Sequence, residues 1–590
     1  MNSNRAIATV FCRSGILLML ALLLIAPARM QGAGKAAAPA ASLKTLKTRP
    51  ESTNYAETSR YDDVIQFMKT VAAASPRVHL TTYGYTFEGR ALPLAVIGAK
   101  DASPEAVKAT GKTRIYVQGN IHAGEVEGKE ACLEILRDLG LGQHAGWFNS
   151  IVLMVNPIYN ADGNERINLT NRGSQNGPVG GMGQRQNAQN YDLNRDFMKL
   201  DAPETRAFAL MMSRYDPHIV VDLHTTDGSA HGYQITYAPP LHPVTAAGVV
   251  DILRNGLLPA VTKTVKAKDG MDFYYYGNFP SGGRGGGMPG GRGGVPAGQA
   301  AAAGARGRGE PTGGRGEMPG GRSGMPTERA FYTTEPTARY GINMVGLHNR
   351  LGILSETFSF LPFQDRIRAA RRFVEEICNY AQMHGAEINK ATEDADRQSI
   401  AGREVALRGK AVKSAEQVEI LVTEVTTEKN PYTGQMMRRR LDVSKPERMY
   451  QYISFEPSET TIAPRVYFVP ASRLAQDRLE AHGISFSKLD QALTIKGEQF
   501  RIESSTQAER DYEGHRARAL AGKWEATELS VPAGILMVPV DQPLGRLVLM
   551  LLEPRSEDSL AAWGLMEDLL AQQPPVYPVM RTSETVPAIK

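Results

Sequence analysis

Four short segments of this chain carry side chains that could hold a metal ion and activate water. They are His122-Ala123-Gly124-Glu125, Asp192-Leu193-Asn194-Arg195, Asp222-Leu223-His224 and the single residue Glu356. Two histidines and one carboxylate form a known catalytic zinc set, in which water takes the fourth position. We therefore predict that these segments together hold one Zn²⁺ and leave an open coordination position for water.

Further charged residues could act on a substrate at such a metal. Glu356 is the predicted general base, which would take a proton from the water and pass it to the leaving amine. Arg185 could polarise a scissile carbonyl and stabilise the oxyanion, although Arg172 competes for that role. The alternatives are structural, since Glu356 could be a salt-bridged glutamate at the edge of the core and Arg172 a solvated loop residue.

The segment around Arg195 has the residue types that recognise a carboxylate. Arginine offers a planar fork for bidentate binding, and Asn194 adds a donor. Asp192 could orient His122 through the free ring N–H, a common arrangement around metal ligands. Asp192 could instead cap a turn or a helix, and His224 could be a strand-end histidine whose hydrogen bonds are satisfied.

The hydrophobic pattern places these segments at the ends of strands. Short apolar runs between turn residues predict buried strands of a largely parallel sheet, and amphipathic stretches predict helices. Strands are predicted at 78–80, 91–97, 114–117, 151–155, 219–221 and 353–354, and helices at 61–74, 126–139 and 364–383. Ligands of open α/β sheets bind outside the carboxyl ends of the strands, where His122, His224 and Glu356 would lie.

These motifs, in this order, resemble the carboxypeptidase A-like family of zinc carboxypeptidases. The family pattern is His-x-x-Glu, an Asn-Pro-Asp-Gly-like turn, Asp-x-Asn-Arg, a strand-end His and a catalytic Glu. Here the turn is Asn160-Ala161-Asp162-Gly163, with alanine in place of the usual proline. Gly84-Tyr85-Thr86-Phe87-Glu88-Gly89-Arg90 also resembles an early hairpin of the family. The resemblance covers roughly residues 55–385.

The resemblance implies a fold and a set of roles. The fold would be a three-layer α/β/α sandwich on a mixed, mostly parallel sheet. Zinc would be held by His122, Glu125 and His224, the carbonyl activated by Arg185, the terminal carboxylate gripped by Asn194 and Arg195, and the water activated by Glu356. The mobile substrate-binding tyrosine of the family is assigned to Tyr340, with Tyr332 as the other candidate.

The chain divides into several predicted parts. Residues 1–28 are a predicted signal peptide, with basic residues before the apolar run 15–25 and the small-x-small cleavage site Ala26-Pro27-Ala28; an uncleaved anchor is the alternative. Residues 29–54 form a predicted linker, 55–395 the catalytic domain and 396–590 a β-rich accessory domain. Because the apolar run is shorter than the about 20 residues of a membrane-spanning helix, we expect a periplasmic or secreted protein without stable membrane insertion after cleavage.

The accessory domain shows no evident catalytic set. Strands are predicted at 418–425, 466–469, 500–503, 535–538 and 547–552, and helices near 474–481 and 558–570. Glu513-Gly514-His515 could bind a metal ion, but an exposed loop is the favoured interpretation.

The distribution of charge along the chain gives no indication of a nucleic-acid-binding surface. The net charge is +5, and residues 281–328, a Gly/Arg-rich stretch with six arginines and three glutamates, supply +3 of it. Such a stretch buries too little apolar surface to fold, so we predict a disordered insertion. The near-neutral remainder predicts no nucleic-acid partner. Cys132 and Cys378 could form a disulfide, but separate buried thiols on helices are favoured.

We therefore predict an exported zinc-dependent carboxypeptidase that acts on peptides with a free C-terminus. A zinc amidase for cell-wall peptides or N-acyl amino acids would use the same chemistry. The third possibility is an inactive peptidase-fold protein that binds a partner.

Overall fold

The computed structural model describes residues 41–226, 229–279 and 329–586, all within one compact unit, Ala38–Lys590. The predicted signal peptide and the Gly/Arg-rich insertion lie outside the described residues. The described part of the predicted linker contains two short helices, α1 (Ala41–Thr45) and α2 (Arg49–Ser52). Thr48 and Glu51 form a capping box at the start of α2, which satisfies donors that a helix end leaves unpaired.

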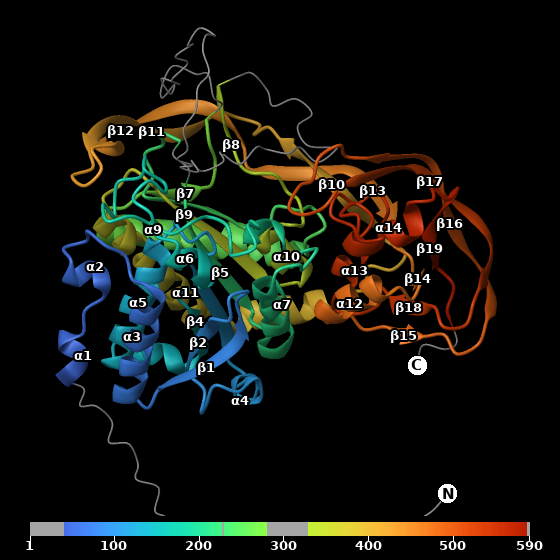
Figure 1. Cartoon of the computed structure of the whole chain (residues 1–590), viewed down its shortest axis with the longest axis horizontal. Helices are drawn as coiled ribbons and strands as arrows, with labels where there is room; N and C mark the ends of the chain where they lie inside the picture. The colour runs from blue at the N-terminus through green and yellow to red at the C-terminus, as the bar shows by residue number, and fades with distance from the viewer. Residues whose placement is uncertain (1–40, 227–228, 280–328, 587–590) are drawn as a thin grey trace, which may run out of the picture. The chain divides into compact units, whose positions relative to one another are not determined.

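An eight-stranded sheet forms the centre of the predicted catalytic region, residues 55–395, in the order β1-β2-β4-β3-β5-β9-β6-β7 (Figure 1). Four consecutive strands of this sheet, β4, β3, β5 and β9, are parallel to one another. The pairs β1–β2, β2–β4 and β6–β9 are antiparallel. The strands are β1 (Val78–Tyr85), β2 (Ala91–Ile97), β3 (Thr113–Gly119), β4 (Ile151–Asn156), β5 (Ile219–Thr225), β6 (Ile235–Ala238), β7 (Phe273–Tyr275) and β9 (Leu351–Thr357). The predicted mixed, mostly parallel sheet is confirmed.

Helices cover both faces of this sheet. Because successive strand residues point to opposite faces, Ile115 and Val117 of β3 join the buried cluster with α3, α5, α9 and α11, whereas Tyr116 joins the cluster with α7 and α10. The helices are α3 (Tyr61–Ala74), α4 (Pro104–Lys108), α5 (Glu127–Gly140), α6 (Ala161–Glu165), α7 (Pro203–Tyr215), α8 (Ala247–Asp251), α9 (Leu258–Asp269), α10 (Gly341–Leu347) and α11 (Phe363–Arg397). The three-layer α/β/α fold is confirmed.

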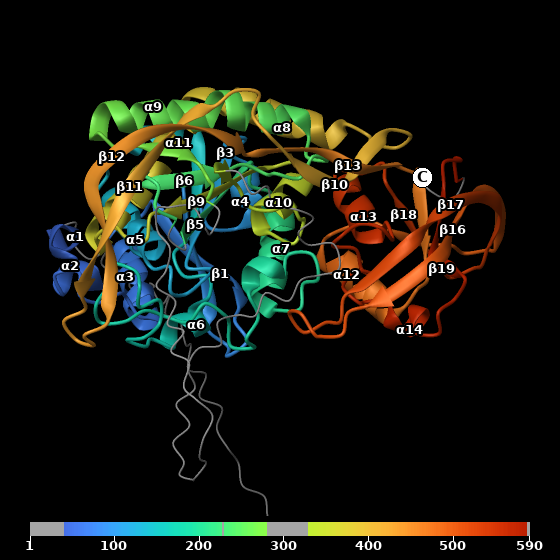
Figure 2. The ribbon, with the colours of Figure 1, turned by 90° about the horizontal axis from the view of Figure 1, so that it is seen from above.

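A β-rich region follows α11, as predicted, and it shares a core with the catalytic region. Many of its apolar residues belong to the same buried cluster as α7 and α10, and Figure 2 shows part of this region beside these helices. Its sheets have the orders β10-β13, β11-β12-β8 and β15-β18-β14-β19-β16-β17. The strands are β8 (Ala330–Tyr332), β10 (Glu404–Val412), β11 (Val418–Lys429), β12 (Met436–Tyr452), β13 (Ser454–Ile462), β14 (Val466–Val469), β15 (Ser487–Lys488), β16 (Leu493–Gln507), β17 (Arg518–Val531), β18 (Leu536–Pro539) and β19 (Val576–Thr582).

Two predictions for this region are wrong. Residues 547–552 lie in a helix, α13 (Gly545–Leu552), and of 558–570 only α14 (Glu567–Leu570) is helical. Every side chain of α13 is buried, and a short, wholly apolar run carries no periodicity that separates a strand from a buried helix. The predicted helix at 474–481 is present as α12 (Arg473–Ala481).

The cysteine prediction is confirmed, since Cys132 on α5 and Cys378 on α11 are both free and buried. Burial raises the pKa of both thiols, so neither is a reactive thiolate. Among the described residues, no helix has the length and apolar character needed to cross a membrane.

Candidate metal centre and active site

Three buried side chains converge beyond the carboxyl ends of β3 and β5. His122 follows β3, Glu125 precedes α5, and His224 lies near the end of β5. Glu125 places Oε1 2.9 Å from His122 Nδ1 and Oε2 2.9 Å from His224 Nδ1. One ligand atom of each residue lies within 4.8 Å of the others. Because two ligand atoms of a tetrahedral zinc lie about 3.3 Å apart, the cluster has the size that a zinc ion requires.

Two glycines allow α5 to approach the sheet this closely. A Cβ atom on Gly119, the last residue of β3, would lie 2.8 Å from the carbonyl carbon of Gly128 in α5. A Cβ atom on Gly128 would lie 2.6 Å from Leu223 Cβ in β5. Any larger residue would push the helix away from the strands, so these glycines keep Glu125 within reach of His224, 99 positions later in the chain.

The second ring nitrogen of each histidine contacts a carboxylate. His122 Nε2 lies 3.0 Å from Asp192 Oδ1, and His224 Nε2 lies 2.9 Å from Asp222 Oδ2. These contacts hold a proton on Nε2 and turn Nδ1 toward the common centre. Arg185 Nη1 donates to His122 Nδ1 at 3.2 Å, which requires a lone pair on that nitrogen. The donor set therefore fits a zinc ion.

Positively charged neighbours lower the pKa values of two carboxylates at the cluster, Glu125 and Asp192. Burial alone would raise the pKa of Glu125, but His122 and Arg172, whose Nη2 lies 2.5 Å from Oε1, hold that pKa well below its usual range. Burial would likewise raise the pKa of Asp192, yet Arg185 and Arg195 hold it well below its usual range. Both groups are therefore anions at neutral pH and suit cationic or donor partners.

The loop that carries Arg185 is held by the Asn160-Ala161-Asp162-Gly163 segment. Asn160 Nδ2 donates to Arg185 O at 3.1 Å and to Ile121 O at 3.2 Å, directly before His122. The Arg185 side chain donates to Asp192 Oδ2 at 2.8 and 3.1 Å. Asp162 receives hydrogen bonds from Thr86 and from Arg90 at 2.7 Å. The two segments that resemble family motifs thus contact each other and brace the site.

Arg195, Asn194 and Tyr340 lie together beside the cluster. The Arg195 guanidinium lies over the Tyr340 ring, 4.4 Å from its centroid. Asn194 Oδ1 accepts a hydrogen bond of 2.9 Å from Gly341 N, which fixes the start of α10. In the part of the chain that the structure describes, Arg195 makes one side-chain hydrogen bond, to Asn194 O, and its closest carboxylate oxygen is Asp192 Oδ2 at 3.9 Å. A half-buried guanidinium without a bidentate partner is suited to an external carboxylate.

Glu356 stands in β9 directly opposite His224 in β5, within the parallel register. Partners at the same level of adjacent strands point to the same face, so the two side chains share a face of the sheet. Tyr332, the other candidate for the mobile tyrosine, is buried in β8, with its ring 4.7 Å from that of Tyr452. The structure thus brings Tyr340, and not Tyr332, to Arg195.

Sequence reasoning did not predict that Asp222 and Glu513 orient groups of this cluster. The exposed loop that it favoured for Glu513-Gly514-His515 is wrong, because Glu513 and His515 are partly buried against the rest of the protein. Asp222 shares one face of β5 with His224, and its spacing of two residues could have revealed the contact. Glu513 comes from the C-terminal region, and its Oε2 accepts a hydrogen bond of 2.9 Å from Asp192 N across 321 positions. No local sequence pattern predicts a contact between residues so far apart in the chain.

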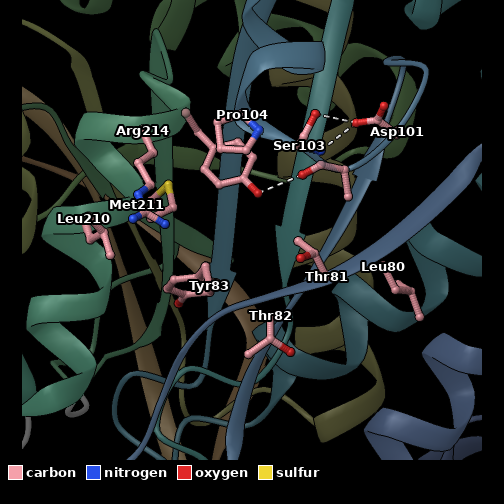
Figure 3. A pocket seen from close by; sticks show the side chains of 12 residues that line it. Leu80, Thr81, Thr82, Tyr83, Asp101, Ser103, Pro104, Leu210, Met211 and Arg214 are labelled. Atoms are coloured by element: carbon pink, nitrogen blue, oxygen red, sulfur yellow. Dashed lines mark hydrogen bonds between the residues drawn. The ribbon is translucent and has the colours of Figure 1, made fainter.

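A separate cavity of about 470 Å³ lies between β1, the 101–104 loop and α7 (Figure 3). Tyr83, Ser103, Met211 and Arg214 are among its lining residues. Tyr215, also at this cavity, donates to Ala102 O at 2.8 Å. None of the lining residues belongs to the cluster around His122, so this cavity is separate from the candidate site.

The α/β/α sandwich and the cluster of two histidines and one glutamate together define a metallohydrolase of the α/β class. Residues 64–255 match the zinc carboxypeptidase family. The chain is 22% identical to carboxypeptidase 2 of Trichophyton rubrum over 525 residues, which cover 87% of this chain and 85% of that protein. It is 31% identical to carboxypeptidase Z of Gallus gallus over 170 residues, 27% of this chain and 25% of that protein.

Solved structures are also similar. The metallo-carboxypeptidase from Burkholderia cenocepacia matches with a TM-score of 0.36 and 14% identity, over 56% of this chain and 70% of that chain. The carboxypeptidase A from Helicoverpa armigera matches with a TM-score of 0.30 and 18% identity, over 40% of this chain and 60% of that chain.

Proposed function

We propose that this protein is an exported zinc-dependent carboxypeptidase that hydrolyses the C-terminal bond of peptides. The observation that carries the proposal is that Asp192 contacts both parts of the site. It links a buried His-Glu-His cluster of zinc-binding size to Arg195, which has no bidentate partner among the described residues. The first set suits hydrolysis, and the second suits a free carboxylate at the end of a substrate.

His122 Nδ1, Glu125 and His224 Nδ1 would hold the metal. A bound zinc ion supplies Lewis acidity and makes water nucleophilic at neutral pH. The carboxylates of Asp192 and Asp222 keep the two imidazoles in the orientation that presents Nδ1. Burial of all three donors excludes bulk water, which strengthens their interaction with a cation.

Glu356 would take a proton from the attacking water and give it to the leaving amine nitrogen, so that the base returns to its carboxylate form. Its place opposite His224 supports this role. Arg185 would donate to the scissile carbonyl oxygen as negative charge develops there. In the structure its guanidinium already lies beside Glu125, 3.5 Å from Oε1, and is held in place by Asp192.

Arg195 and Asn194 would bind the terminal carboxylate of the peptide. The Asn194 amide oxygen is engaged by Gly341 N, which leaves its NH₂ group as the donor toward a ligand. Tyr340 supports the guanidinium through its ring face, and its hydroxyl would bind the peptide. Only a substrate that ends at the site can place a carboxylate there, which is the basis of exopeptidase action.

Export rests on residues 1–28 of the sequence. Expression of the full chain in a host with its own secretion pathway, followed by N-terminal sequencing of the mature protein, tests it. Cleavage after Ala28 supports export, and recovery of the whole chain from the cytoplasm would contradict it.

The activity is tested with a mixed peptide library and mass spectrometry. The mature protein, its Glu356→Gln variant and a chelated sample are compared. Loss of single residues from free C-termini by the first sample alone is the expected result. Cleavage of internal bonds, or equal cleavage of C-terminally amidated peptides, would refute the carboxypeptidase and favour another amide substrate.

A further inference from the structure

A tight turn between β16 and β17 has an unusual residue at its tip. Tyr512 N donates to His515 O at 2.8 Å, and His515 N donates to Tyr512 O at 3.1 Å. The two central residues, Glu513 and Gly514, have φ angles of +47° and +85°, as in a type I′ turn. Glycine, asparagine and aspartate adopt such angles easily, whereas glutamate adopts them at an energetic cost.

The hydrogen bond that the Glu513 carboxylate accepts explains why a glutamate occupies this position despite the backbone strain. Glu513 Oε2 receives the hydrogen bond from Asp192 N, at 2.9 Å. Asp192 is only 8% exposed, so without this acceptor its N–H group would be left unpaired away from water. Strained backbone that the surroundings enforce is found mainly at functional sites.

The residue that Glu513 holds is central to the site. The Asp192 side chain contacts His122 Nε2 at 3.0 Å and accepts two hydrogen bonds from Arg185. A displaced Asp192 main chain would therefore turn a proposed metal ligand and the proposed carbonyl donor at the same time.

The turn is fixed to the catalytic region at the two residues that follow Glu513. His515 Nε2 lies 2.6 Å from Asp201 Oδ2. Gly514 packs against Tyr191, because a Cβ atom there would lie 3.0 Å from two atoms of that ring and hydroxyl. The turn is thus held firmly enough to position Asp192.

We propose that the turn formed by Tyr512, Glu513, Gly514 and His515 belongs to the active site, and that Glu513 is a positioning residue. Glu513 holds the Asp192 main chain so that His122 and Arg185 keep the orientation that zinc binding and carbonyl polarisation require. This inference rests on the proposed function of that site. It makes the C-terminal region a component of the catalytic machinery and not a detachable module.

The test compares three variants of the full chain. Glu513→Asn suits the turn better but is one methylene too short to reach Asp192 N. Glu513→Gln keeps an acceptor of the same reach. Asp511→Asn is the matched control, because Asp511 is exposed and its side chain pairs with Arg516. Zinc affinity by chelator competition, kcat and KM on a free peptide, and the thermal unfolding midpoint are measured for each.

The expected result separates positioning from stability. In Glu513→Asn, relief of the turn and loss of the hydrogen bond to Asp192 N offset each other, so the variant should unfold near the wild-type temperature. It should nevertheless lose about 10-fold or more in zinc affinity and in kcat. Glu513→Gln should restore both to within a few fold, and Asp511→Asn should match the wild type.

Two results would overturn the inference: wild-type zinc affinity and kcat in Glu513→Asn, or a fall in all quantities together with the unfolding temperature. If the wild-type protein binds zinc but cleaves no peptide, the proposed function fails. The zinc affinities of the asparagine and glutamine variants then still decide whether Glu513 positions the metal site.

Discussion

Replacing Arg195 by alanine should separate recognition of the substrate terminus from the chemistry. The guanidinium stacks on Tyr340, makes one side-chain hydrogen bond to the described protein and is 22% exposed. The removed group therefore has donors to offer a carboxylate in a partly desolvated position. Glu356, His122 and Glu125 are not touched by the change.

The size of the effect follows from the bonds lost. A hydrogen bond to a charged group contributes about 1.5–3 kcal/mol net, and a bidentate pair adds geometric selectivity. Allowing for partial solvent exposure of Arg195, we take about 3 kcal/mol for the pair. Since 1.36 kcal/mol corresponds to a factor of ten, Arg195→Ala should lower kcat/KM by about 100-fold on peptides with a free C-terminus.

The assay uses two matched peptides, one with a free C-terminus and one amidated, and measures kcat/KM for the wild type and the variant. The wild type should strongly prefer the free peptide, and Arg195→Ala should lose most of that preference. Arg214→Ala is the control, because this exposed arginine lines the separate cavity at β1 and α7. It should leave both rates unchanged.

An equal loss on both peptides would refute the reasoning, because the arginine would then support the fold or the metal site and not the substrate carboxylate. Zinc content measured on the same samples distinguishes these two causes.

Three further predictions test the base, the metal site and the buried charges. Glu356→Gln should retain zinc while kcat falls about 10³-fold; a variant with more than a tenth of the wild-type kcat would remove Glu356 from the role of base. Asp222→Ala should weaken zinc affinity about 10–100-fold in chelator competition, because His224 loses the partner of its Nε2, and an unchanged affinity would show that Asp222 does not orient the ligand. Burial raises the pKa of Glu204 from 4.5 to about 7, so the folded state keeps a proton that the unfolded state releases between these values, and stability falls as the pH rises through this window. The free energy of unfolding of Glu204→Gln should therefore equal that of the wild type below pH 4.5 and exceed it by about 3 kcal/mol at pH 8. Urea unfolding at both pH values measures this difference, and a difference that does not change with pH would contradict the prediction.

The sequence by itself determined the elements that carry the site. Alternating or continuous apolar residues specify β3, β5 and β9 because local burial patterns follow from strand geometry. His122, His224 and Glu356 follow or end these strands, and parallel strands bring their carboxyl ends to one edge. The convergence of His122, Glu125 and His224 was therefore predictable, while their roles, and those of Asp192, Arg185, Asn194, Arg195, Tyr340 and Glu356, stay predictions.

The limits of sequence reasoning lie where a choice depends on distant partners. Residues 547–552 form a helix and not a strand because the buried cluster around α7 and α10 surrounds them on all sides, and an apolar run is compatible with either form. Tyr340, and not Tyr332, reaches Arg195 because β8 pairs with β12 and buries Tyr332 against Tyr452.

Only the tertiary structure joined Glu513 to Asp192. The two residues are 321 positions apart, and the sequence of a Glu-Gly turn carries no signal of what lies opposite it. The C-terminal region shares one core with the catalytic region, and this packing brings the turn to the metal site. Sequence therefore specifies which groups can perform the chemistry, whereas the packing of distant segments decides which groups hold them in place.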